Sequence, residues 1–218
     1  MSARNGFDPI LFDLDGTVVD TVTLILESHR HAVRAVLGQE FSDERLVANV
    51  GRPLLEQMEA FSPAHADELY RVYREWNHAH TAELIASYDG ITPLLRQLTA
   101  AGRQLGLVTS KTRDAVDLAF ASLPIAEYFD VVISADDSSR HKPDPEPLRV
   151  ALAGLGRTAN GGCYVGDSPF DIQAGQGAGM TTIAVTWGFF GRADLEAVRP
   201  DIVCETADEL GQVLLGTA

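Results

Sequence analysis

The 218-residue chain is strongly acidic, with 31 aspartates and glutamates against 17 lysines and arginines, which gives a formal net charge of −14. Such a surface repels nucleic acids and anionic membranes, so we expect neither as a partner. No apolar run approaches the roughly 20 residues of a membrane span, and residues 1–7 lack a signal-peptide pattern. We therefore expect a cytoplasmic protein, monomeric or homodimeric. A small anionic substrate is compatible with the charge, because salt screens distant charges and nearby cations dominate.

A short apolar run at 9–12 leads into Asp13 and Asp15, which is typical of a buried parallel strand and the loop at its carboxyl end. Apolar residues then recur at helical spacing from Thr21 to about Ser87. After residue 88 the pattern alternates between helices and strands, with glycines at the joints. We expect strands over 105–109, 130–134, 163–166, 182–186 and 202–204, and helices over 93–101, 112–123, 146–155, 169–177 and the C-terminal residues.

This alternation predicts an α/β fold with a doubly wound parallel sheet, that is, a Rossmann-like core. The helical stretch falls between the first strand and the rest of the sheet, so we interpret it as an inserted all-helical cap domain. The predicted domains are a catalytic core made of residues 1–20 and 88–218 and a helical cap made of residues 21–87.

Polar side chains follow the strands at ends that meet at one edge of the predicted sheet, where open α/β sheets bind ligands. Carboxylates this close repel each other unless a hard divalent cation lies among them, and a carboxylate site suits Mg²⁺. The cation and one ammonium can then hold a phosphate dianion, as phosphoryl transfer requires. The residues at these strand ends are Asp13, Asp15, Thr109, Ser110, Lys142, Asp167 and Asp171.

The same residues fall into four motifs: Asp13-x-Asp15-Gly16-Thr17, Thr109-Ser110, Lys142 within residues 141–147, and Gly166-Asp167-Ser168-x-x-Asp171. In order and spacing the motifs resemble those of the haloacid dehalogenase superfamily, and the lysine motif resembles that of its phosphoglycolate phosphatase and pyrophosphatase branch. The resemblance covers essentially the whole chain, because the helical insert falls where that branch has its cap. It implies a Mg²⁺-dependent phosphatase acting on a small phosphorylated metabolite, such as phosphoglycolate, pyrophosphate or a nucleotide.

Carried over by position, the resemblance implies that Asp13 is the nucleophile that becomes an aspartyl phosphate and that Asp15 is the general acid and base. It implies that Thr109, Ser110 and Lys142 bind the phosphoryl group. The implied metal ligands are Asp13, Asp15 through its backbone carbonyl, and Asp167, with Asp171 as a further ligand or as a residue that orients one.

Each of these residues also has an ordinary structural interpretation when taken alone. The stretch from Asp13 to Thr17 is compatible with a tight turn, Asp167 can cap a helix that begins near Pro169, and Lys142 can be a solvated turn residue. The ordinary interpretations together would require four coincidences at one sheet edge, so we favour the functional interpretation of the set.

Two cations outside the motifs are less specific signals. Arg52 follows Gly51 in a predicted cap loop, where it is a candidate for binding the substrate or else pairs with Glu56. Lys111 borders the pocket or begins an exposed helix, and we favour the exposed position. The histidines that we expect at the surface or in an interface are His29, His31, His78 and His80. The segment 187–190 could line the pocket mouth or make a dimer contact, but we favour a role in packing.

Other functions fit parts of the pattern. The resemblance disfavours dehalogenation, which does not use an acid–base aspartate at the position of Asp15, and phosphonate cleavage, because residues 21–87 contain no lysine for a Schiff base. A sugar-phosphate mutase stays open, since it shares Asp13 and Asp15. A phospho-receiver signalling module also has an acceptor aspartate, but it is shorter and lacks a cap.

Overall fold

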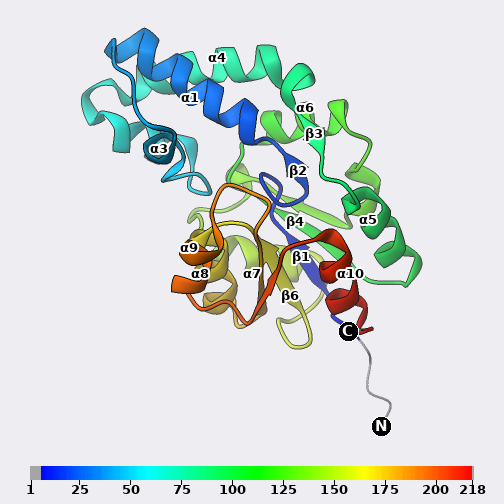
Figure 1. Cartoon of the computed structure of the whole chain (residues 1–218). Coiled ribbons are helices and arrows are strands. Elements are labelled where there is room, and N and C mark those ends of the chain that lie inside the picture. Colours follow the sequence, from blue (N-terminus) through cyan, green and yellow to red (C-terminus); the bar gives the residue numbers. More distant parts are fainter. Residues whose placement is uncertain (1–5, 218) are drawn as a thin grey trace.

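The computed structural model describes residues 6–217, which form a six-stranded parallel sheet, helices on both of its faces, and a further group of helices above its carboxyl-terminal edge (Figure 1). The strands are β1 (Ile10–Phe12), β4 (Leu105–Val108), β5 (Val131–Ile133), β6 (Cys163–Gly166), β7 (Thr181–Val185) and β8 (Ile202–Cys204). The sheet order is β5-β4-β1-β6-β7-β8, and every neighbouring pair is parallel. The predicted doubly wound α/β fold is confirmed.

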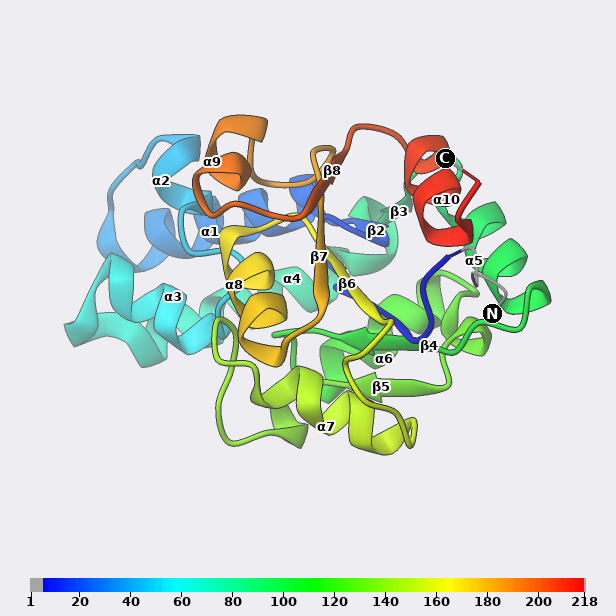
Figure 2. The same cartoon turned by 90° about the horizontal axis from the view of Figure 1, so that it is seen from below.

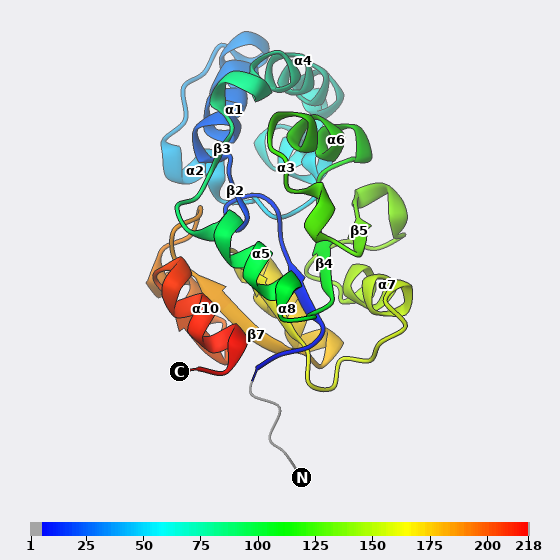
Figure 3. The same ribbon diagram turned by 90° about the vertical axis from the view of Figure 1, so that its right-hand side faces the viewer.

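Helices cover both faces of the sheet, which is why its strands are mostly apolar. They are α5 (Ile91–Ala100), α6 (Arg113–Ser122), α7 (Glu146–Gly154), α8 (Pro169–Ala178), α9 (Arg192–Ala197) and α10 (Ala207–Leu215), with single 3₁₀ turns at Ala126–Tyr128 and Ala135–Asp137. Helices α5, α6 and α10 share a core with Ile10 and Phe12, whereas α7 and α8 pack around Leu11 and Tyr164. Figure 3 shows α5 and α10 on one side of the sheet and α7 on the other.

The chain between β1 and α5 forms a group of helices that we call the helical insert. It contains α1 (Val22–Leu37), α2 (Asp43–Val47), α3 (Leu54–Phe61), a 3₁₀ turn at Pro63–His65 and α4 (Ala66–Leu84). These helices have an apolar core of their own, which includes Leu46, Met58 and Leu69. Figure 2 shows α1, α2 and α3 grouped away from α5 and α10. No helix in the described range 6–217 is both long and apolar enough to cross a membrane.

A short antiparallel pair stands at the base of the helical insert. In it, β2 (Val19–Asp20) pairs with β3 (Ala86–Ser87), so the outgoing and returning chains lie side by side. The sequence pattern predicted helix as far as residue 87, which is wrong for Ala86 and Ser87. Two-residue strands are too short to show a period of their own. The two strands end next to the two predicted domain boundaries, whose exact positions stay a prediction.

His29 lies at the centre of the helical insert with none of its side chain exposed, so the expected surface position is wrong. Its ring packs against Phe61 and Tyr73, with ring centroids 5.3 and 4.9 Å away. Neither ring nitrogen has a hydrogen-bond partner among the described residues. Burial lowers the pKa of His29 to about 3, against a smaller opposing effect of the Gln57 side chain. The folded protein therefore holds this imidazole in its neutral form.

The buried histidine makes the stability depend on pH. The unfolded chain binds a proton at His29 below about pH 6.5, whereas the folded chain does so only near pH 3. Acidification between these values favours unfolding by about 1.4 kcal/mol per pH unit from this group. His29→Leu should remove that part of the loss between about pH 7 and about pH 5, as measured by urea unfolding. Equal pH slopes in the two proteins would contradict the assignment.

Candidate active site

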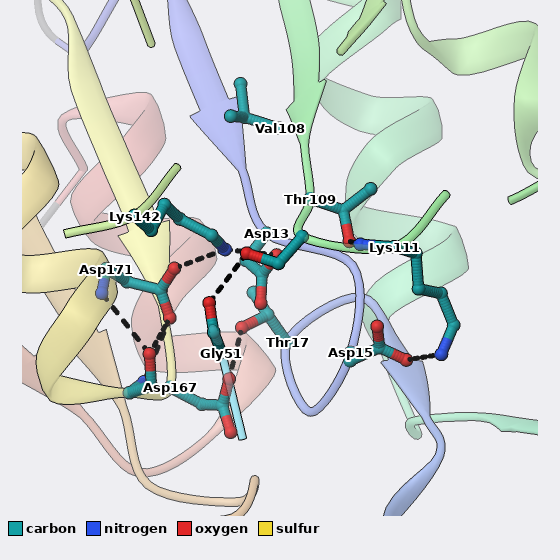
Figure 4. A network of polar contacts seen from close by, with 12 residues as sticks. Asp13, Asp15, Thr17, Gly51, Val108, Thr109, Lys111, Lys142, Asp167 and Asp171 are labelled. Atoms are coloured by element: carbon teal, nitrogen blue, oxygen red, sulfur yellow. Dashed lines mark hydrogen bonds and ion pairs between the residues drawn. The ribbon is translucent and has the colours of Figure 1, made fainter. Parts of the chain in front are cut away.

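The polar strand ends converge on a cavity of about 180 Å³ between the sheet edge and the helical insert (Figure 4). Of the residues predicted for the site, those that border the cavity are Asp13, Asp15, Arg52, Thr109, Ser110, Lys142 and Asp167. Asp171 does not border it and lies behind Lys142. The four motifs therefore meet at one place, although they are spread over most of the chain.

Asp13 lies at the carboxyl end of the central strand β1 and is 3% exposed. Its Oδ1 accepts a hydrogen bond from Lys142 Nζ at 2.8 Å. Burial raises the pKa of Asp13 to about 7; Lys142 opposes this rise, and the nearby carboxylates of Asp171 and Asp15 add to it. Even with Lys142 in contact, this carboxylate is partly protonated at neutral pH, so a further cation nearby would favour its ionised form.

Lys142 is buried, and its ammonium lies between two carboxylates. The second carboxylate is that of Asp171, at 2.7 Å, and Tyr164 Oη lies 3.2 Å away. Burial alone would lower the pKa of Lys142, but Asp13 and Asp171 outweigh this effect and hold its pKa above the ordinary value. The alternative of a solvated turn lysine is therefore wrong.

Asp171 has its acceptor sites occupied. Oδ1 accepts from Lys142 Nζ and from Tyr164 Oη, the latter at 3.0 Å, and Oδ2 accepts from the backbone N–H and the hydroxyl of Ser168. These four hydrogen bonds use about as many acceptor sites as a carboxylate offers. The contact with Ser168 is also the capping box that begins α8. Asp171 thus orients Lys142 and the start of α8.

Asp167 is held by two loops and is 1% exposed. Its Oδ1 accepts from Thr17 Oγ1 at 3.3 Å, and its Oδ2 accepts from the backbone N–H of Phe189 at 2.7 Å. Trp187 Nε1 donates to the backbone carbonyl of Thr17 at 3.1 Å. A Cβ on Gly188 would lie 2.1 Å from Oδ2 of Asp167, so this backbone lies directly against the carboxylate. The segment 187–190, for which packing was the favoured role, also holds the carboxylate of Asp167 in place.

Three buried carboxylates could hold a metal ion. One oxygen from each of Asp13, Asp167 and Asp171 lies within 4.8 Å of the others. Burial raises the pKa of Asp167 well above its usual range, and the charges of Asp171 and Asp13 raise it further. A hard divalent cation would remove this conflict by favouring the ionised forms.

Lys111 was expected at an exposed helix start, but its side chain is largely buried. Its Nζ lies 2.8 Å from Oδ1 of Asp15, and the two side chains are 14% and 12% exposed. Thr21 Oγ1 donates to the same oxygen at 2.8 Å. Both lysines of the chain therefore border the cavity. The available sequence signals were the scarcity of lysine and the position of Lys111 directly after Ser110.

The two hydroxyl residues after β4 have different partners. Thr109 is 4% exposed, and its Oγ1 accepts from the backbone N–H of Lys111 at 3.2 Å. The hydroxyl proton of Thr109 is thus left to bind a ligand oxygen. Ser110 Oγ donates instead to the backbone carbonyl of Gly51 in the helical insert, at 2.6 Å. In this arrangement the Ser110 hydroxyl links the sheet edge to the insert, and its proton is not offered to the cavity.

Arg52 follows Gly51 and borders the cavity from the helical insert. Its Nη1 lies 3.5 Å from Oε2 of Glu56, and its guanidinium lies over the ring of Phe170, 4.8 Å from the centroid. The two alternatives predicted for Arg52 do not exclude each other, since its side chain borders the cavity and also pairs with Glu56. His78 of α4 borders the cavity too, and its side chain is 30% exposed.

Comparison with known proteins shows which family the chain belongs to. The model of the haloacid dehalogenase-like hydrolases matches residues 10–185. The chain belongs to this family. Pyrophosphatase PpaX of Bacillus velezensis is 38% identical over 92% of this chain and 93% of its own length. Pyrophosphatase PpaX of Anoxybacillus flavithermus is 37% identical over 94% of this chain and 95% of its own length.

Solved structures of other proteins share the fold. A predicted phosphatase from Clostridium acetobutylicum has a TM-score of 0.85 and 26% identity, over 94% of this chain and 97% of its own. A haloacid dehalogenase-like hydrolase from Streptococcus pneumoniae has a TM-score of 0.83 and 25% identity, over 94% and 96%. The resemblance predicted from the four motifs is confirmed, and so is the expectation that this haloacid dehalogenase-like chain is a hydrolase.

The buried ion pairs of Lys142 lead to a test by stability. Lys142→Ala would leave Asp13 and Asp171 buried without their cation and should lower the free energy of unfolding by about 3–5 kcal/mol. Adding Asp171→Asn to that variant removes one uncompensated charge and should restore part of the loss. Urea unfolding in EDTA measures both. A single variant within about 1 kcal/mol of wild type would contradict this electrostatic account.

Proposed function

We propose that this chain is a Mg²⁺-dependent phosphatase that hydrolyses a small phosphorylated metabolite through a phosphorylated Asp13. The observation that carries the proposal is the place of Asp13, whose buried carboxylate faces the cavity between Lys142 and Asp167. Relatives that match nearly the whole chain are named pyrophosphatases, and one structural neighbour is described as a predicted phosphatase. These names support the same chemical class of substrate.

The residues that would hold Mg²⁺ are Asp13 and Asp167, with the backbone carbonyl of Asp15. This cluster has three buried carboxylates and one ammonium, Lys142, which contacts two of them; the formal charge of −2 is what one divalent cation would balance. When bound, Mg²⁺ would neutralise charge on the transferring phosphoryl group. Asp171 would not be a ligand, because its oxygens already accept four hydrogen bonds.

The side chains around the cavity fit a two-step displacement. An oxygen of Asp13 would attack phosphorus while the bond to the leaving oxygen breaks, and Asp15 would give its proton to that oxygen. Asp15 would then take a proton from a water molecule, whose oxygen attacks phosphorus and frees Asp13. Lys142 and Thr109 would bind the phosphoryl oxygens. Lys111 bonds one oxygen of Asp15 and would leave the other to carry the proton.

Arg52 would bind the part of the substrate that is not transferred. Its contact with Glu56 is long, and the two side chains are 39% and 45% exposed, so this pair is weak and can give way to a ligand. Stacking on Phe170 keeps the guanidinium beside the cavity. A guanidinium binds a carboxylate or a phosphate bidentately, and phosphoglycolate and pyrophosphate each carry such a group.

Phosphate release tests the proposal. Wild-type protein should release inorganic phosphate repeatedly from pyrophosphate or phosphoglycolate in Mg²⁺, and EDTA should stop the release. Asp13→Asn should lower turnover by about 10⁴-fold or more, because it removes the nucleophile. Asp117→Asn, at an exposed position of α6, is the matched control and should keep wild-type turnover.

Each contrary result has its own meaning. A folded Asp13→Asn protein with wild-type turnover would refute the covalent step. Transfer of the phosphoryl group to a second sugar phosphate, without free phosphate, would indicate the mutase alternative. Stoichiometric phosphorylation without turnover would indicate a receiver.

Gly188 gives a test of the proposed metal site that does not depend on turnover. Gly188→Ala would place a methyl group 2.1 Å from Oδ2 of Asp167 and displace that carboxylate. Changes to groups that orient metal ligands typically weaken metal binding by about 10- to 100-fold, and we expect this range for Mg²⁺ by calorimetry. The control is Gly191→Ala, whose Cβ would meet its nearest atom at 3.7 Å. Equal Mg²⁺ affinity in the two variants would contradict the role of Asp167.

A further inference from the structure

The cavity has an acidic side and a basic side, and the sheet order fixes their places. β6, on one side of β1, is followed by Asp167, whereas β4, on the other side, leads into Lys111. Figure 4 shows Asp167 and Asp171 on one side of Asp13, and Lys111 with Asp15 on the other. A ligand held at Asp13 that extends toward β4 therefore approaches the ammonium of Lys111, which is paired with Asp15.

Arg74 adds a second cation to this basic side, from the helical insert. It lies on α4, which packs against α6, and its Nη2 forms an ion pair with Asp114 in the first turn of α6. Its Nη1 donates to Tyr70 Oη at 3.4 Å. Arg74 borders the cavity and Asp114 does not, so the carboxylate holds the guanidinium from behind. A guanidinium has five N–H donors, and these contacts among the described residues leave others for a ligand.

The ion pair with Asp114 leaves Arg74 able to attract an anion. The two side chains are 33% and 50% exposed, and exposed pairs of this kind are weak. His78, one helical turn further along α4, also borders the cavity. Among the described residues of the helical insert that border the cavity, none is an aspartate or glutamate. An anion on this side would therefore meet donors and apolar side chains without facing an acidic group of the insert.

We propose that Arg74 binds a negative charge on the leaving group of the substrate and so selects diphosphates and phosphorylated acids over phosphate esters of uncharged alcohols. The inference rests on the proposed phosphatase function and adds a residue that determines specificity. Arg52, over Phe170 on the β6 side, and Arg74, over Asp114 on the β4 side, approach the cavity from opposite sides. A leaving group between the two guanidiniums would contact both, and Arg74 is the one on the side that also carries Lys111.

The competing explanation is structural. Arg74 and Asp114 join the insert to the sheet domain, and their pair could do no more than hold the insert over the cavity. A contact with that role alone would affect every substrate alike, and removing either partner would have the same effect. A contact with the leaving group would depend on the charge of that group and on Arg74 alone.

The experiment compares pyrophosphate, whose leaving group is charged, with phenyl phosphate, whose alcohol portion is uncharged. Arg74→Gln should lower kcat/KM for pyrophosphate by about 10- to 100-fold, the effect of one charge-assisted hydrogen bond. The value for phenyl phosphate should change less than about threefold. Asp114→Asn should keep the preference for pyrophosphate. Arg71→Gln is the matched control, because Arg71 lies on the same helix, pairs with Glu75 and does not border the cavity.

Equal losses for both substrates in Arg74→Gln and Asp114→Asn would overturn the proposal in favour of the structural role, and so would an unchanged kcat/KM for pyrophosphate. Calorimetry with pyrophosphate and Mg²⁺ on the Asp13→Asn background, with and without Arg74→Gln, needs no turnover. Binding about 10-fold or more weaker without Arg74 supports the proposal, and equal binding overturns it. An inactive wild type whose binding depends on Arg74 would refute the phosphatase function while leaving the anion site in place.

Discussion

Two buried carboxylates face one buried ammonium at the carboxyl end of β1, and the rest of the site depends on this contact. The side chains of Asp13, Lys142 and Asp171 are at most 4% exposed. Removing such charges from water costs several kcal/mol per ion unless close partners compensate. Lys142 compensates both carboxylates and so fixes the distance between β1 and the start of α8. A site built around a buried cation in this way is set before a ligand arrives, as electrostatic catalysis requires.

The loops must approach these carboxylates closely, and glycines allow them to do so. A Cβ on Gly166 would lie 2.3 Å from the Cβ of Asp171, and one on Gly16 would lie 2.3 Å from Oδ2 of Asp167. The glycines in the motifs therefore serve packing against charged side chains as much as turn geometry. Gly188 does the same from a loop outside the motifs, which shows that a further strand end, after β7, supports the site.

Much of the fold and of the site could be predicted from the sequence, because both follow from local pattern. Apolar runs mark the strands, and parallel strands bring their carboxyl ends together, which groups Asp13 with Asp167 across most of the chain. Long-range packing has no such local signal. Lys111 has the sequence context of an exposed helix start, and its pairing with Asp15 depends on the path of a distant loop. His29 was misplaced because aromatic rings from two other helices bury it.

The charge of the cavity lining differs from the charge of the chain as a whole. The chain carries a net charge of −14, yet both of its lysines and two of its fifteen arginines border a single cavity. The acidic surface repels small anions at long range, an effect that falls off beyond about 8–10 Å in physiological salt. Inside the cavity, desolvated cations at contact distance act far more strongly than distant surface charges. Selection of an anionic ligand by this protein thus depends on contacts made within the cavity, which is where Lys142, Lys111 and the arginines of the helical insert lie.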